Sequence, residues 1–249
     1  MKTLGRFVAV FALAAGAISQ AAPVVNSTGT GGAGLPDPYY QLIALPGVYP
    51  EALPANYGDS TVEAAYRLNA GGLPNSPWQA YPEPVHWIAP QTWYGENHSD
   101  PWGTYIFRTT FDLTGFALDT VSLGGLWSSD NCGFDIRVNG LSTGSWGMVS
   151  PACLSSQHQF TIGPSVAVQT MIQGVAQFSP TNPFITGINT IDFIVRNENC
   201  SGCPRNPTGI AVYFNDVRGE LLYSTPEPGT FGLLATALFG LAALRRRKT

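Results

Sequence analysis

Along most of this chain, apolar and polar residues alternate in short runs, as expected of β-strands with one buried face. The clearest run is YIFRTTFDL, where Tyr105, Phe107, Thr109 and Phe111 alternate with Ile106, Arg108, Thr110 and Asp112. Similar runs follow between turn residues, one of them ending at an Asn139-Gly140 turn signal. These further predicted strands are 120–127, 133–138, 159–162, 190–196, 209–214 and 217–223. Strands at this spacing predict an antiparallel β-sandwich or jelly roll.

Two parts of the middle depart from this pattern. Residues 35–100 are rich in Pro, Tyr and Trp, and predict short strands and ordered loops. In Val166–Phe178 the apolar residues recur at near-helical spacing, which makes this the one candidate helix of the domain, although β-branched residues disfavour it.

The two ends of the chain predict export. Lys2 and Arg6 precede an apolar run from Phe7 to Ile18, and small residues then favour cleavage after Ala21 or Ala22. We therefore predict a signal peptide, with a signal helix, over residues 1–21. The alternative, a permanent N-terminal anchor, is disfavoured because about 20 apolar residues are needed to cross a bilayer.

At the other end, a Pro-Glu-Pro motif leads into an apolar stretch from Phe231 to Leu244 and then into a basic cluster. The motif is Pro226, Glu227 and Pro228, and the basic cluster is Arg245, Arg246, Arg247 and Lys248. Fourteen helical residues rise about 21 Å, which is short for a hydrocarbon core of about 30 Å. The basic cluster favours a cytoplasmic C-terminus. The alternative interpretation is an ordinary single-span anchor.

This layout resembles the PEP-CTERM sorting signal, in which a Pro-Glu-Pro motif, a short transmembrane helix and a basic tail are recognised by an exosortase. The resemblance covers residues 225–249. It implies transient anchoring in the inner membrane, processing by signal peptidase and exosortase, and delivery to the cell envelope, the outer surface or the extracellular matrix beside exopolysaccharide. We predict a flexible Gly/Ser/Thr-rich linker over residues 22–34 and one β domain over residues 35–224.

The order of the later strands resembles the galactose-binding-like jelly roll that many carbohydrate-active enzymes carry as an accessory domain. The resemblance spans about Trp87 to Tyr223. It rests on GTYIFRTTFDL, VSLGGLWSSDNCGFDIRVNG, GINTIDFIVRN and GIAVYFNDVRGEL. In such domains, loops like the one at Asp130 and Asn131 sometimes contribute to sugar or calcium binding, whereas a hydrogen-bonded turn is the commoner role of such a pair. Asp135 and Arg137 alternate with apolar residues and should face solvent or one another across strands.

Composition narrows the function further. Charged residues make up 11% of the chain and the formal net charge is −4, so a basic surface for nucleic acid is not expected. The six tryptophans could stack on sugar rings. Trp93 and Trp102, flanked by Gly, Asn and Asp, are the candidates for an exposed platform. Trp127 is expected in the core. No carboxylate pair, triad or metal motif of an enzyme stands out, so we expect neither catalysis nor a cofactor.

The four cysteines of an exported chain predict two disulfides. They are Cys132, Cys153, Cys200 and Cys203. Three pairings are open, and the one that closes the two local loops, Cys132–Cys153 with Cys200–Cys203, is favoured. A zinc site or a redox-active Cys-x-x-Cys at Cys200 and Cys203 is the alternative. The histidines His86, His98 and His158 show no spacing that would complete a zinc site.

Three functions are consistent with these features. The first is a non-enzymatic surface or matrix protein that binds carbohydrate or contributes to adhesion. The second is a purely structural matrix or surface-layer protein that acts through protein contacts. The third is a secreted hydrolase, which has the least support in the sequence.

Overall fold

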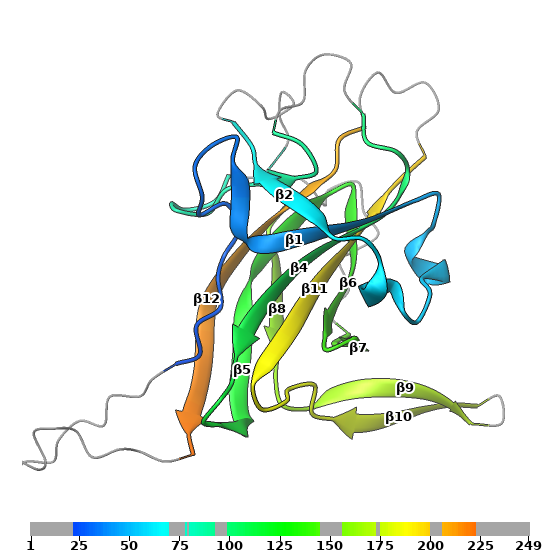
Figure 1. The fold of residues 1–249 in the computed structure, drawn as a ribbon. Helices are drawn as coiled ribbons and strands as arrows, with labels where there is room; N and C mark the ends of the chain where they lie inside the picture. The colour runs from blue at the N-terminus through cyan, green and yellow to red at the C-terminus, as the bar shows by residue number, and fades with distance from the viewer. Residues whose placement is uncertain are drawn as a thin grey trace, which may run out of the picture. The chain divides into compact units, whose positions relative to one another are not determined.

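The computed structural model describes residues 22–69, 78, 80–92, 99–144, 156–172, 175–199 and 206–222. Its elements in chain order are β1 (Pro36–Pro46), the 3-10 turns η1 (Pro50–Ala52) and η2 (Tyr57–Asp59), β2 (Glu63–Arg67), β3 (Ile88–Ala89), β4 (Gly103–Asp112), β5 (Phe116–Asp130), β6 (Cys132–Val138), β7 (Leu141–Ser142), β8 (His158–Ile162), β9 (Val166–Ile172), β10 (Val175–Thr181), β11 (Ile188–Asn197) and β12 (Gly209–Leu221). The described chain is therefore all-β, as predicted (Figure 1).

Ten of the strands form one antiparallel sheet in the order β7-β6-β11-β4-β1-β2-β3-β12-β5-β8. The sheet curls on itself, which the aromatic contacts of Phe193 show. This residue of β11 contacts rings of β5, β8 and β12, with ring centroids 5.6 Å from Trp127, 5.9 Å from Phe160 and 6.2 Å from Phe214. Because five strand steps separate β11 from β12 within the sheet, only curling brings them face to face (Figure 1).

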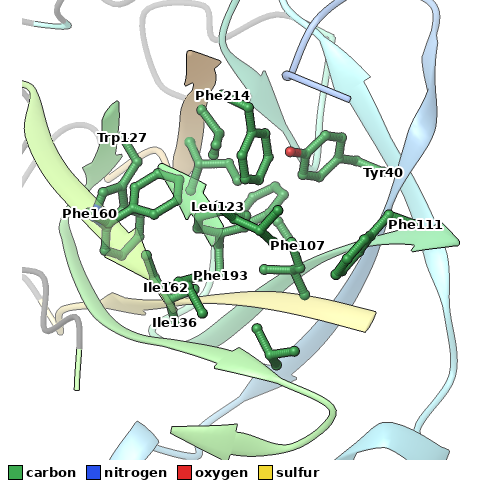
Figure 2. Close-up of a cluster of buried hydrophobic side chains, with 14 of the residues drawn as sticks. Tyr40, Phe107, Phe111, Leu123, Trp127, Ile136, Phe160, Ile162, Phe193 and Phe214 are labelled. Carbon is green, nitrogen blue, oxygen red and sulfur yellow. The ribbon is translucent and has the colours of Figure 1, made fainter. Parts of the chain in front are cut away.

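The main core fills the inside of the curl. Figure 2 shows its side chains converging from strands on both sides. Phe107, Leu123, Ile136, Ile162 and Phe193 are all fully buried. Removing this apolar surface from water is the principal stabilising contribution to such a sheet. The fold is thus sandwich-like, and its finer assignment to a galactose-binding-like jelly roll stays a prediction.

A close approach inside this core explains one glycine. A Cβ placed on Gly133 at the start of β6 would overlap the ring of Trp127 on β5. Trp127 is buried, as the alternation of its strand predicts. Glycine at position 133 therefore lets the largest core side chain lie against the backbone of β6.

Several strand predictions are confirmed with small changes of boundary. The Asn139-Gly140 turn joins β6 to β7 with positive φ angles of 51° and 80°, as a type I′ hairpin requires. The two predicted strands 209–214 and 217–223 form one strand, β12, with an irregularity between Phe214 and Asp216.

Two predictions are wrong. Val166–Phe178 is not helical, because Val166–Ile172 and Val175–Thr181 pair as an antiparallel hairpin, β9–β10, in agreement with the strand preference of β-branched residues. The predicted linker, residues 22–34, does not hang free of the sheet. Thr28 is fully buried and exchanges hydrogen bonds with Val212, while the Gly29 N–H donates to Asp37 Oδ2 at 2.6 Å. Small residues here allow the backbone to lie close against the sheet.

The predicted signal helix, the sorting tail and the basic cluster lie outside the described residues. Within the described ranges, no helix has the length and apolarity needed to cross a membrane.

Candidate functional site

Several loops and strand ends meet at one end of the curled sheet, which we call the Trp102 end. Gly103, the first residue of β4, is paired with Asn197, the last residue of β11. Arg196 is paired with Cys132 at the start of β6. On the other side of the curl, Asp130 ends β5. The antiparallel register therefore brings segments from positions 100, 131 and 197 together.

Trp102 forms an aromatic cluster at this end with a tyrosine and an arginine. The Trp102 side chain is 37% exposed, and its ring centroid lies 4.9 Å from that of Tyr49 at an interplanar angle of 43°. The guanidinium carbon of Arg196 lies 4.3 Å from the Tyr49 ring centroid, within cation–π range. These contacts hold three flat groups in fixed positions while leaving part of the indole accessible.

Two carboxylates complete the cluster. Arg196 Nη1 lies 2.7 Å from Glu51 Oε1, and Arg196 Nε lies 2.9 Å from Glu198 Oε1. Both glutamate side chains are about half exposed. We call the set Trp102, Tyr49, Arg196, Glu51 and Glu198 the Trp102 cluster. It places a partly exposed indole ring beside charged hydrogen-bonding groups.

Hydrogen bonds hold the backbone around Trp102 in place. The Gly47 N–H donates to the carbonyl of Trp102 at 2.8 Å, and Thr104 Oγ1 donates to the carbonyl of Val48 at 2.6 Å. Asn197 Nδ2 donates to the carbonyl oxygens of Asp100 and Pro101. These hydrogen bonds fix the backbone of Trp102, which directly precedes β4, against the segment that follows β1.

Asp130 and Asn131, the predicted ligand pair, make structural hydrogen bonds. Asp130 is buried and accepts from Trp78 Nε1 at 2.7 Å and from Asn131 Nδ2 at 3.1 Å. Asn131 Oδ1 accepts from the Glu198 N–H at 2.7 Å. Asn131 thus positions the backbone of a Trp102 cluster residue, whereas Asp130 is turned away from solvent.

Burial dominates the electrostatics of Asp130. Desolvation by burial and the negative charge of Asp100 raise its pKa, while the hydrogen bonds from Trp78 and Asn131 lower it, and the net result is a pKa of about 7 against the ordinary 3.8. The oxygens of Asp100 accept from Gln91 Nε2 and the Thr208 N–H, both at 2.8 Å. In the described ranges, no three His, Cys, Asp or Glu side chains are grouped as metal ligands.

This raised pKa predicts a pH dependence of stability. Folded Asp130 holds its proton more tightly than unfolded Asp130, so the folded state binds more protons between the two pKa values. The free energy of unfolding should therefore fall as pH rises from about 4 to about 7. Asp130→Asn, which cannot ionise, should flatten this slope.

Urea denaturation at several pH values would measure the effect. Asp112→Asn is the control, because Asp112 is exposed and hydrogen bonds lower its pKa, which gives the opposite slope at more acidic pH. An unchanged slope in Asp130→Asn would contradict the prediction.

A second polar cluster lies on the outer face of the sheet, in its middle. Asp192 of β11 accepts two hydrogen bonds from Arg108 of β4, at 2.7 and 2.9 Å, and one from the Tyr57 hydroxyl at 2.8 Å. Asp135 and Arg137, both on β6, pair with each other at 2.9 Å within that strand, and Asp135 is buried, so they neither face solvent nor pair across strands as predicted. The loop that carries η2 covers this face, so both pairs are largely shielded and we assign them a structural role.

Of the remaining predicted site residues, only Cys132 lies within the described part of the chain. Cys132 is disulfide-bonded at the start of β6. The other three cysteines, Cys153, Cys200 and Cys203, lie outside the described residues, so the disulfide pairing stays a prediction. Trp93 also lies outside them. Tyr49, Arg196, Glu51 and Glu198 were not predicted as site residues, because nothing in their spacing shows that the register brings them to Trp102.

Comparison with known proteins identifies the C-terminal segment. Residues 224–248 match the family model of the PEP-CTERM protein-sorting motif. No curated protein and no solved structure matches the chain. The motif marks an exported protein that an exosortase sorts to the cell surface.

Proposed function

We propose that this exosortase-sorted protein binds exopolysaccharide at the Trp102 end and so contributes to adhesion or to the extracellular matrix, without catalysing a reaction. The partly exposed Trp102 ring, held against Tyr49 near Arg196, is the observation that carries the proposal. Signal peptidase and exosortase would be its partners during processing. Transient inner-membrane anchoring would precede release or surface attachment.

The chemistry of the cluster suits a sugar ligand. An indole face is apolar and flat, and it can stack on the C–H face of a pyranose ring. Glu51, Glu198 and Arg196 offer charged acceptors and donors to the surrounding hydroxyl groups. Because the backbone around Trp102 is already fixed, binding would require little additional ordering.

The same carboxylates fit catalysis poorly. A glycosidase needs one carboxyl group whose pKa is raised by burial, so that it can donate a proton at neutral pH. Glu51 and Glu198 are about half exposed and contact the same guanidinium. They are better suited to hydrogen bonding than to proton transfer.

Replacing the ring tests the proposal. Trp102→Ala should weaken binding of the processed chain to exopolysaccharide from its host by about tenfold, because loss of a stacked ring costs on the order of 1 kcal/mol or more. Affinity electrophoresis in gels that contain the polysaccharide would measure the change.

Tyr39→Ala is the matched control, since Tyr39 is a 47% exposed aromatic residue outside the cluster. It should leave the affinity unchanged. Equal binding by wild type and Trp102→Ala would overturn the proposal, and no binding by wild type would favour a purely structural matrix protein.

A further inference from the structure

Both ends of the described domain leave the sheet at the end opposite the Trp102 end, which we call the basal end. Residues 23–28 run antiparallel to β12. The Phe214 N–H donates to Ser27 Oγ at 3.0 Å, and a Cβ placed on Gly219 would lie 3.2 Å from the Pro23 ring. The N-terminal segment therefore begins beside the residues where β12 ends.

The basal end carries exposed apolar side chains. The set, which we call the basal apolar surface, is Val24 (74% exposed), Ile185 (51%), Ile188 (62%), Leu221 (40%) and Leu222 (56%). Backbone hydrogen bonds bring their segments together. The Leu113 N–H donates to the Gly187 carbonyl at 2.9 Å, and the Leu222 N–H donates to the Gly115 carbonyl at 2.7 Å. Large exposed apolar side chains gathered at one end are typical of an interaction surface.

The sequence on either side of the domain indicates what covers this surface. The predicted signal-peptide run ends at Ile18, and the apolar stretch of the sorting tail begins at Phe231. The eight residues 223–230 extend over about 28 Å at most. While either apolar run is in the membrane, the basal end is therefore confined close to the lipid surface.

We infer that the basal apolar surface rests on the inner-membrane lipid surface while the precursor is anchored. The inference rests on the proposed transient anchoring of the precursor and is independent of carbohydrate binding. The exposed residues Asp112 and Glu220 near this surface are acidic, so apolar partitioning at the interface, not attraction to anionic headgroups, would be the driving force.

This orientation has a geometric consequence. The ten residues of β4 separate Trp102 from Asp112 by about 30 Å. With the basal end on the bilayer, the Trp102 end points away from it. Removal of the tail leaves only a few interfacial side chains as contacts, which are too weak to retain the protein.

Site-specific photocrosslinking in the full-length precursor tests the inference. A benzoyl-phenylalanine at position 188, in a host that lacks exosortase activity, should form adducts with phospholipid. The same probe at Ala52, in η1 beside the Trp102 cluster, is the control and should form several-fold fewer. A second probe at position 185 guards against a folding defect of the first variant.

Each outcome separates the claims. Preferential lipid adducts at positions 188 and 185 support the inference. Equal adducts at Ala52, or adducts to a second copy of the chain in place of lipid, overturn it while leaving sorting intact. A full-length precursor that is absent from the membrane fraction overturns both the inference and the proposed anchoring, whatever the polysaccharide affinity of the processed chain.

Discussion

Phe193→Ala should destabilise the domain by about 4 kcal/mol, because it removes a fully buried ring from the centre of the core and leaves a cavity. The ring contacts Trp127, Phe160 and Phe214, which belong to the strands that the curl brings opposite β11. These neighbours are large, so they can fill the gap only partly. Thermal and urea unfolding of the processed chain would measure the loss.

Ile188→Ala is the control on the same strand, since Ile188 is largely exposed. It should change the free energy of unfolding by no more than about 0.5 kcal/mol. Similar losses in the two variants would contradict the packing of β11 against β5, β8 and β12, and with it the curled sheet.

Asp192→Ala should lower the free energy of unfolding by about 3 kcal/mol. Asp192 is next to Phe193 in β11, but its side chain lies on the outer face of the sheet. It leaves Arg108 without the two hydrogen bonds of its carboxylate partner and removes the acceptor of the Tyr57 hydroxyl. The Asp192 side chain is 1% exposed and that of Arg108 is 17% exposed, so water cannot fully replace the lost partner.

Asp216→Ala provides the matched comparison. Asp216 makes an equivalent two-bond pair with Arg218, but both side chains are exposed. Its loss should cost less than about 1 kcal/mol. A double variant, Asp192→Leu with Arg108→Met, should recover much of the stability lost in Asp192→Ala, because it removes the unpaired charge. Equal losses in Asp192→Ala and Asp216→Ala would contradict the buried role.

Strand periodicity predicted most of the sheet because its signal is local. The alternation from Tyr105 to Asp112 and the Asn139-Gly140 turn require no knowledge of distant residues. Ile106 shows where this reasoning ends. It falls on the face predicted to be polar, yet it is fully buried, because the loop carrying Tyr57 packs over it together with Ile43 and Ile194.

The candidate site was predicted only in part for the same reason. Asp100 and Gly103, close to Trp102 in the chain, indicated exposure, and Trp102 is 37% exposed, whereas its role as a binding platform stays a prediction. The partners of Trp102 come from positions near 49 and 196, and only the pairing of β1 and β11 with β4 brings them together. The error at the predicted linker, residues 22–34, is similar, because composition indicates how freely a chain can bend but not that Thr28 will form hydrogen bonds with Val212.

The position of β12 has a consequence for the timing of folding. β12 is the last strand in the described part of the chain, yet it lies between β3 and β5 within the sheet and also accommodates the N-terminal segment. A chain that crosses the membrane from its N-terminus cannot close its sheet until about residue 221 has emerged. Phe231 follows only ten residues later. Completion of the fold and arrival of the sorting tail in the bilayer should therefore be nearly simultaneous, so the translocating chain stays open until the end of its passage.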